Sequence, residues 1–228
     1  GDTPARQGVH ANILMGLEKY DEARALVDSA LKAGGDDLDA HLAAANLELS
    51  LNKPAEAKTH VEWLEQHAAD RADTWLLGGE VELMQERYSE GTDAFAKAVA
   101  IVPNHPMGLY ALGRAAVMAQ RIPEADRAAE GLRRIAKDSP MTHFVEGYIA
   151  MAKGDFVQAK EKLRLVLKAY PAQAQAQSLL ATILLSEAQY EQAADYLEKL
   201  NNRFPADARI ARLLTVARLQ SHQAGKAV

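Results

Sequence analysis

The chain has 228 residues, of which 48% are hydrophobic and 25% charged, and its 26 basic and 31 acidic side chains leave a net charge of −5. This composition is typical of a folded protein, and the mild negative charge disfavours a surface for DNA or RNA. The absence of cysteine excludes disulfides and thiolate chemistry, and no stretch reaches the roughly eighteen apolar residues of a membrane helix, so we expect no direct membrane insertion of this segment.

From Pro4 onward the sequence repeats every 34 residues without an insertion or deletion. We number the positions of each repeat from Pro4, which holds position 1. The repeats cover residues 4–37, 38–71, 72–105, 106–139, 140–173, 174–207 and, in part, 208–228. Position 8 holds tiny side chains in all six full repeats, namely Ala11, Ala45, Gly79, Gly113, Gly147 and Ala181, and position 20 does the same. Tiny residues at fixed positions indicate closely packed backbones, so we expect residues 4–228 to form a single elongated array.

Each repeat has the pattern of two short helices joined by a tight turn. In the third repeat, large apolar and aromatic side chains recur at helical spacing on both sides of Glu86 and Arg87. Proline at position 32, as in Pro103 and Pro171, ends the second segment because its ring cannot continue a helix. We therefore predict an all-α fold of antiparallel helix pairs, with about 13 helices in the chain.

These positions resemble the tetratricopeptide repeat, whose pattern has a large residue at position 4, Gly or Ala at position 8, an aromatic at position 17, Ala at position 20 and Pro at position 32. Trp75, Gly79 and Tyr88 carry the match in the third repeat. Individual repeats depart from the pattern at Pro54, Ile122 and Lys137, which neighbouring repeats can compensate. The resemblance implies a right-handed solenoid that acts as a non-catalytic scaffold for protein–protein interaction and needs no cofactor.

The second half of the chain resembles a narrower group, the multi-repeat lipoproteins of the PEP-CTERM/exosortase export system of Gram-negative bacteria. Residues 145–148, 153–156 and 204–205 carry this likeness. It implies a fragment of a longer protein involved in export or envelope assembly, with a periplasmic or outer-membrane-anchored parent and a cytoplasmic one as the alternative. On this view residues 208–228 begin a truncated repeat, whereas the alternative is that residues 208–221 form a capping helix.

The family resemblance places the first helix of each repeat on an inner, concave surface. Positions 2, 5 and 9 then supply the candidate peptide-binding residues, which are Asn12, Leu42, Asn46, Leu76, Glu80, Met107, Tyr110, Arg114, Met141, Phe144 and Tyr148. Apolar and aromatic residues dominate the middle of this set, and a few buried rings can supply most of the free energy of peptide binding. The alternative is that neighbouring repeats cover the same residues, which would then belong to the core.

Motifs for catalysis or metal binding are incomplete in this sequence. Residues 108–115 have the glycine spacing of a phosphate loop, but Arg114 and Ala115 replace the Lys and the Ser or Thr that the loop needs. His60 and His67 lie seven residues apart and lack a third ligand nearby. Asn12 and Asn46 are typical of a clamp for a C-terminal carboxylate, but the lysine of that clamp is missing. We therefore expect no catalytic residue, no metal site and no enzyme activity.

The sequence predicts a scaffold that binds a peptide or helix of a protein partner in its concave groove. One alternative is a regulatory or substrate-delivery domain of a larger enzyme or secretion machine. Another is a structural module that self-associates through its C-terminal end near Val228. None of these alternatives involves nucleic acid.

Overall fold

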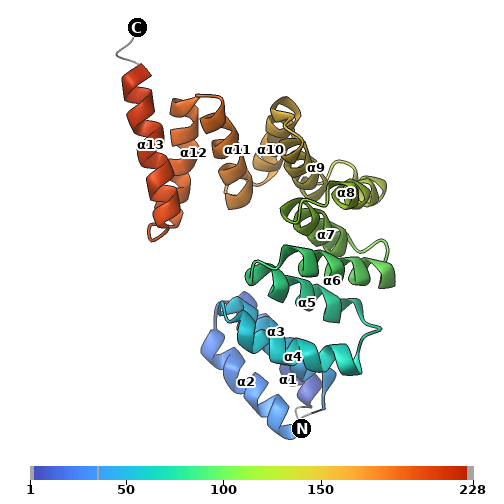
Figure 1. The fold of residues 1–228 in the computed structure, drawn as a ribbon. Helices are drawn as coiled ribbons and strands as arrows, with labels where there is room; N and C mark the ends of the chain where they lie inside the picture. Colours follow the sequence, from blue (N-terminus) through green and yellow to red (C-terminus); the bar gives the residue numbers. More distant parts are fainter. Residues whose placement is uncertain (1–2, 35, 225–228) are drawn as a thin grey trace. The chain divides into compact units, whose positions relative to one another are not determined.

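The computed structural model describes residues 3–34 and 36–224, which form thirteen helices and no strand (Figure 1). The helices are α1 Pro4–Gly16, α2 Tyr20–Ala33, α3 Leu38–Ser50, α4 Pro54–His67, α5 Ala72–Met84, α6 Tyr88–Ile101, α7 Pro106–Met118, α8 Ile122–Ala136, α9 Pro140–Ala152, α10 Phe156–Ala169, α11 Ala174–Ser186, α12 Tyr190–Arg203 and α13 Ala208–Ala224. The prediction of an all-α fold with about thirteen helices is confirmed. Odd-numbered helices up to α11 are the first helices of the repeats, and even-numbered ones are the second helices.

The first helices begin where a side chain can cap them. Asp37, Ser139 and Asp207 occupy position 34, and each side chain accepts a hydrogen bond from the backbone N–H three residues later, at 3.0, 3.2 and 3.2 Å. Such a bond satisfies one of the free N–H groups at a helix N-terminus. Proline at the first helical position of α1, α7 and α9 fits the same site, because the missing N–H would have no partner there.

The turn inside each repeat depends on a left-handed backbone conformation at position 15. Its φ angle lies between 57° and 79° in all six full repeats, at Glu18, Asn52, Glu86, Gln120, Gly154 and Ala188. Only one of these residues is glycine, the residue type that adopts this conformation without a steric cost. The tight turn is therefore enforced by the packing of the two helices rather than by a permissive residue.

Contacts divide the chain into two compact units, Gly1–Glu124 and Ala125–Val228, and the boundary falls within α8. In the first unit, α1, α3 and α5 each pack against their own second helix, and α3, α5 and α7 also pack against the second helix of the preceding repeat. In the second unit, α9 pairs with α10, α11 with α12, and α13 packs on α12. Each unit is a stack of helix hairpins, and the single continuous array of residues 4–228 stays a prediction.

The core of each unit is built from the tiny and apolar positions of the repeat. One cluster in the first unit joins Ala11 of α1 and Ala23 and Val27 of α2 to Ala43 and Leu47 of α3. Because tiny residues at positions 8 and 20 let the helix axes approach, the larger side chains at positions 10 and 24 interlock between them. In the second unit, the cluster of α11, α12 and α13 again joins the tiny Ala181 and Ala193 to a large Leu197 at position 24, although position 10 of α13 holds the small Ala217.

Ion pairs add a polar link between successive repeats. Position 21 of a second helix is basic in Arg24 and Lys58, and each pairs with a glutamate at position 11 of the next first helix, Glu48 and Glu82. The α12–α13 contact has the reverse polarity, because Arg218 at position 11 donates to Glu198 at 2.7 Å. These pairs help to set the register of one hairpin on the next.

Helix α13 differs from the other first helices. It has 17 residues, whereas α1, α3, α5, α7, α9 and α11 have 13 each. It therefore continues through the positions at which the other repeats turn. The expected start of a seventh second helix, near Ala227 and Val228, lies outside the described residues.

Candidate functional site

The candidate groove residues of the first unit lie on four first helices. Asn12 is on α1, Leu42 and Asn46 are on α3, Leu76 and Glu80 are on α5, and Met107, Tyr110 and Arg114 are on α7. Asn12 and Met107 are exposed, and the other six are half-buried. Helix α3 packs against α1 and α5, and α5 packs against α7, so residues at one repeat position lie on neighbouring helices. The helices that carry these residues are therefore neighbours in the first unit, and a shared groove surface made of these side chains stays a prediction.

The polar centre of this surface consists of Glu80, Tyr110 and Arg114. The Arg114 guanidinium carbon lies 5.3 Å from the centroid of the Tyr110 ring, which is within the range of a cation–π contact. Burial raises the pKa of the Glu80 carboxyl, and the positive charge of Arg114 partly opposes this increase. Burial also raises the pKa of the Tyr110 hydroxyl. An acceptor, a cation and an aromatic ring thus share a partly dehydrated surface, where a partner's polar groups would be bound more strongly than in open water.

The remaining candidates, Met141, Phe144 and Tyr148, lie on α9 in the second unit. Met141 is 36% exposed, but Phe144 is only 3% exposed, so its ring is buried rather than displayed. The Phe144 and Tyr148 rings are tilted against each other with centroids 6.1 Å apart. Phe144 therefore fits the alternative that a position 5 residue belongs to the core. Of the apolar and aromatic residues in the middle of the candidate set, Leu76, Met107 and Tyr110 lie in the first unit and these three lie in the second. Their continuity as one surface stays a prediction.

A histidine–tryptophan stack in the second repeat was not predicted from the sequence. The Nδ1 atoms of His41 on α3 and His60 on α4 lie 3.1 Å apart. The Trp63 ring is stacked between His41 and His67, with centroid distances of 3.9 and 4.1 Å. Burial lowers the pKa of His60, and so does the nearby His41. The sequence signal was the helical spacing of residues 60, 63 and 67, which places three rings along one helix, but nothing in it located the ring of residue 41.

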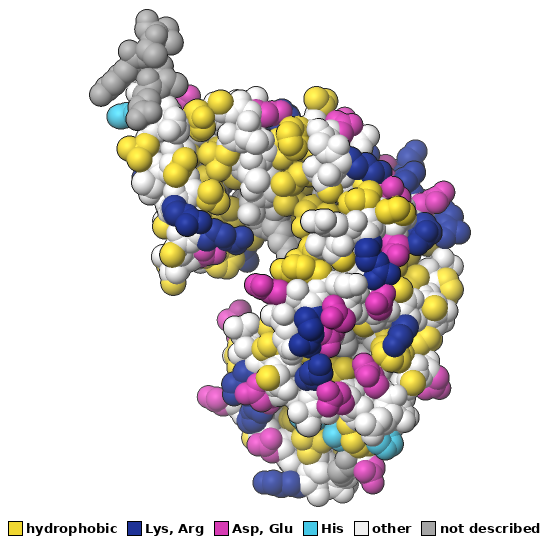
Figure 2. All heavy atoms as spheres, in the orientation of Figure 1, with side chains coloured by type: hydrophobic (Ala, Val, Ile, Leu, Met, Phe, Trp, Pro, Cys, Tyr) yellow, Lys and Arg dark blue, Asp and Glu magenta, His cyan; other side chains and the backbone are white. Residues whose placement is uncertain are grey.

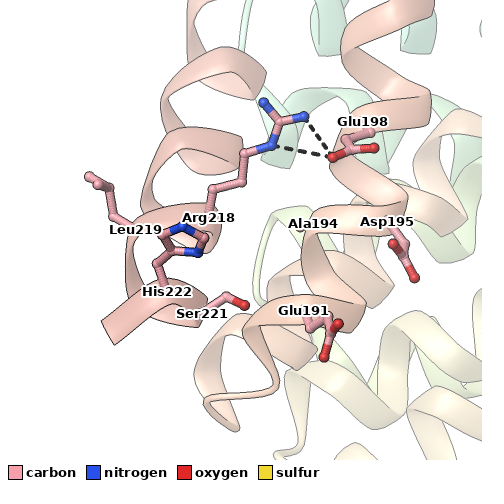
Figure 3. Close-up of a pocket in the computed structure, with 8 residues that line it drawn as sticks. All are labelled: Glu191, Ala194, Asp195, Glu198, Arg218, Leu219, Ser221 and His222. Carbon is pink, nitrogen blue, oxygen red and sulfur yellow. Dashed lines mark hydrogen bonds and ion pairs between the residues drawn. The ribbon is translucent and has the colours of Figure 1, made fainter. Parts of the chain in front are cut away.

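A shallow groove of about 470 Å³ lies between helices α12 and α13 in the second unit (Figure 3). Its lining residues are Glu191, Ala194, Asp195, Glu198, Arg218, Leu219, Ser221 and His222. Figure 3 shows Arg218 directed at Glu198, and this ion pair closes one side of the groove. The groove contains acidic and basic groups, but they are exposed and lie at a surface rather than in an enclosed cavity.

The part of the chain that the structure describes contains no group of three or more His, Cys, Asp or Glu side chains placed to hold a metal ion. Within the same residues, no helix combines the length and the apolar character needed to cross a bilayer. On the face of the first unit visible in Figure 2, basic and acidic side chains are interspersed rather than gathered by sign. That face therefore presents no continuous basic strip of the kind that binds a nucleic-acid backbone.

Sequence comparison identifies matches to two family models that are both described as tetratricopeptide repeat. One matches residues 9–57 and 42–106, and the other matches residues 150–217. The comparison with curated proteins found no significant match.

Comparison of the fold with solved structures found many similar chains. A Pseudomonas aeruginosa protein, pilF, is 16% identical with a TM-score of 0.68, and the match covers 93% of this chain and 96% of that one. PilW, described as a widely conserved type IV pilus biogenesis factor, is 18% identical with a TM-score of 0.72, covering 91% and 96%. YrrB, described as having an unusual peptide-binding site, is 20% identical with a TM-score of 0.54, covering 84% and 97%. At these identities the likeness concerns the fold alone.

Proposed function

The chain belongs to the tetratricopeptide repeat superfamily, and we propose that it is a non-catalytic scaffold that binds a peptide or an amphipathic helix of a protein partner on the inner surface of its first helices. Protein-interaction scaffolding is the typical role of this fold. Rigid hairpins present a preformed surface, so that most of the ordering cost of binding falls on the partner. Beyond this typical role, we propose the specific binding surface and the type of ligand.

One observation carries the proposal: Leu42, Leu76 and Tyr110 occupy position 5 on three successive first helices of the first unit, and all three are half-buried. Apolar side chains that keep part of their area in water can lose it on binding, at about 25 cal/mol for each Å² removed from water. Exposed Met107, at 48%, adds an adaptable apolar contact. The polar centre of Glu80 and Arg114 would orient a peptide backbone, which carries both donors and acceptors.

A second candidate function is a role in export or envelope assembly, as part of a longer bacterial protein. Its support is the similarity in fold to PilW, a protein described as a pilus biogenesis factor. YrrB, described as having a peptide-binding site, supports the proposed type of ligand. A regulatory or substrate-delivery domain of a larger enzyme or secretion machine would use the same surface, so the first experiment concerns the surface itself.

The test uses a displayed library of random 12-residue peptides selected on the purified chain. The affinities of selected peptides are then measured by fluorescence anisotropy for wild type, for M107K and for Y110A. We expect each substitution to weaken binding at least tenfold, because both remove apolar contact area from the surface. A matched control is V157K on α10, since Val157 is exposed at 77% and lies on a second helix.

Two outcomes would overturn the proposed surface. One is selection of peptides whose affinity is the same for wild type, M107K and Y110A. The other is a library from which no peptide binds in a saturable manner. Thermal melting accompanies each variant, and M107K keeps the test decisive if Y110A loses stability, because Met107 is exposed.

A further inference from the structure

Glu80 on α5 is a half-buried carboxylate without a partner among residues 3–34 and 36–224. In that part of the chain, no group donates a hydrogen bond to it and no cation lies within ion-pair distance. Glu82 lies two residues further along α5, nearly opposite Glu80 around the helix. It pairs with Lys58 at 3.5 Å and also with Arg87. The same helix therefore carries one glutamate with two cationic partners and one with none.

Arg114 occupies the same repeat position on α7, the next first helix. Its guanidinium contacts the Tyr110 ring at 5.3 Å, but it makes no hydrogen bond or ion pair with the residues that the structure describes. Burial raises the pKa of Glu80, and the charge of Arg114 opposes this increase, yet the two side chains are not joined by an ion pair. An acid and a base thus lie on neighbouring first helices, and each lacks a counter-charge in contact.

A partly dehydrated charge without a partner costs free energy, which a bound counter-charge offsets. Backbone amides of a peptide can hydrogen-bond to Glu80 or Arg114, but a neutral amide leaves the charge in place. The ammonium of a lysine or the guanidinium of an arginine would neutralise Glu80. A carboxylate would match Arg114, because two parallel N–H groups of a guanidinium can donate to its two oxygens. A ligand with both kinds of side chain would therefore satisfy both residues.

The other charges at the candidate positions do not replace this pair. At positions 2, 5 and 9 of α1, α3, α5 and α7, the remaining charged residues are Asp39 and Asp73. Asp73 pairs with Arg71 at 3.2 Å, and Asp39 lines a shallow hollow together with Arg6. Each aspartate therefore has an arginine beside it, whereas the charges of Glu80 and Arg114 are left for a ligand to balance.

The spacing of the two helices sets the spacing of the ligand's charges. Helices α5 and α7 pack against each other, and the axes of packed helices lie about 8–10 Å apart. An extended peptide rises about 3.3 Å for each residue, so it covers this distance in about three residues. We infer that the ligand is an extended segment with a basic residue opposite Glu80 and an acidic residue about three positions away, opposite Arg114. This inference rests on the groove proposed above and specifies the class of peptide that the groove binds.

The test extends the selection of random 12-residue peptides to wild type, E80Q, E80K and the control E90Q. Glu90 is exposed and lies on the second helix α6, so E90Q makes the same chemical change away from the groove. Glutamine at residue 80 keeps the capacity to hydrogen-bond to a peptide backbone and removes only the charge. We expect wild type and E90Q to select peptides with a base and an acid about three residues apart, and to bind them at least tenfold more tightly than E80Q does. E80K should select an acidic residue in place of the base.

A double-mutant cycle assigns each charge of the ligand to its residue. In a selected peptide the base is replaced by methionine or the acid by glutamine, and affinities for wild type, E80Q and R114Q are measured by fluorescence anisotropy. Each change in the peptide should weaken binding to wild type at least fivefold. The loss of the base should have no effect on binding to E80Q, and the loss of the acid none on binding to R114Q.

The results separate this inference from the groove itself. Selected peptides that depend on Met107 and Tyr110 but lack the two charges, or that bind wild type and E80Q equally, would overturn the paired-charge ligand and leave the groove standing. A library without a saturable binder would overturn both together. Because Glu80 has no partner within the described residues, E80Q should keep the melting temperature of wild type, so that its loss of affinity reports binding.

Discussion

Gly79 on α5 and Phe95 on α6 form a complementary pair, because a Cβ atom on Gly79 would lie 2.5 Å from Cε1 of Phe95. Phe95 is fully buried, so its ring has no space into which it can move. Other hairpins fill the same place with side chains of different size, as with Ala181 and Leu197 in the sixth repeat. The tiny residue at position 8 and the large residue at position 24 therefore share one volume.

Because the residues at positions 8 and 24 share one volume, we predict that substitutions at Gly79 and Phe95 have non-additive effects on the free energy of unfolding. G79A adds helix propensity worth about 1 kcal/mol but overpacks the core at a cost of about 2–3 kcal/mol, so we expect a net loss of about 1–2 kcal/mol in the free energy of unfolding. F95L alone leaves a cavity and also destabilises. The double variant should be at least 1 kcal/mol more stable than the sum of the single changes predicts. Urea unfolding of the four proteins measures this coupling, and simple additivity would contradict it.

The left-handed residue at position 15 gives a pair of opposite predictions. Ala188 adopts a φ of 57° and Gly154 a φ of 79° at the same place in adjacent repeats. A188G should raise the free energy of unfolding by about 0.5–1 kcal/mol, because the left-handed conformation costs alanine more than glycine loses in entropy. G154A should lower it by a similar amount, and since a Cβ there meets nothing within 4 Å, the effect reports the backbone alone. Thermal and urea unfolding measure the stability of both variants. A change of the free energy of unfolding in the same direction for A188G and G154A would contradict the explanation.

The repeat period and its tiny residues were sufficient to predict the hairpins, because close approach of two helix backbones at position 8 requires a tiny residue, which is visible in the sequence. The left-handed turn conformation could be predicted from residue type at only two of the six turns, Asn52 and Gly154. Position 15 holds Glu18, Gln120 and Ala188 among others, and a sequence search for a turn of this kind depends on glycine or asparagine. Packing of the flanking helices overrides that local preference.

Burial of the groove residues was the least predictable property. Tyr110 and Phe144 both occupy position 5, yet the first is half-buried and the second is 3% exposed. The difference depends on the side chains around each residue, which the period does not specify. The contact of His41 with His60 was hidden for the same reason, because residues 19 apart approach only when α3 and α4 pack.

The ion pair between Arg24 and Glu48 should contribute to stability. Nη1 and Nη2 of Arg24 both donate to the Glu48 carboxylate, Nη2 at 3.1 Å to Oε2, and Glu48 is only 6% exposed. R24M leaves a buried carboxylate without its donor, so we expect the free energy of unfolding to fall by about 2 kcal/mol at pH 7. R218M is the control, because the Arg218 and Glu198 side chains are 61% and 45% exposed, and such pairs contribute about 0–1 kcal/mol.

The same pair has a defined dependence on pH. The hydrogen bonds from Arg24 hold the pKa of the Glu48 carboxyl below its ordinary value of 4.5. Its contribution is therefore present above pH 4.5 and is lost as the pH falls through the lower folded value. The difference in stability between wild type and R24M should shrink between pH 7 and pH 3.5 in urea unfolding. A constant difference over this range would show that Arg24 acts through packing alone.

His60 should make the chain less stable in mildly acidic solution. Burial, and then the neighbouring His41, lower its pKa from 6.5, so the unfolded chain takes up a proton at a higher pH than the folded one. This contribution is therefore complete above pH 6.5 and declines as the pH falls below it. The Nδ1 atoms of His60 and His41 lie 3.1 Å apart, and of the nearby charged side chains Glu48 raises the pKa of His60 whereas Arg24 lowers it.

The measurement compares wild type, H60Q and H10Q by thermal and urea unfolding at pH 7.5, 6.5 and 5.5. Substitution by glutamine removes the titrating ring and keeps a polar side chain of similar length. H10Q is the control because it changes an exposed histidine, so wild type and H10Q should both lose stability over this range. H60Q should lose distinctly less, and the same pH profile in all three proteins would contradict the role of His60.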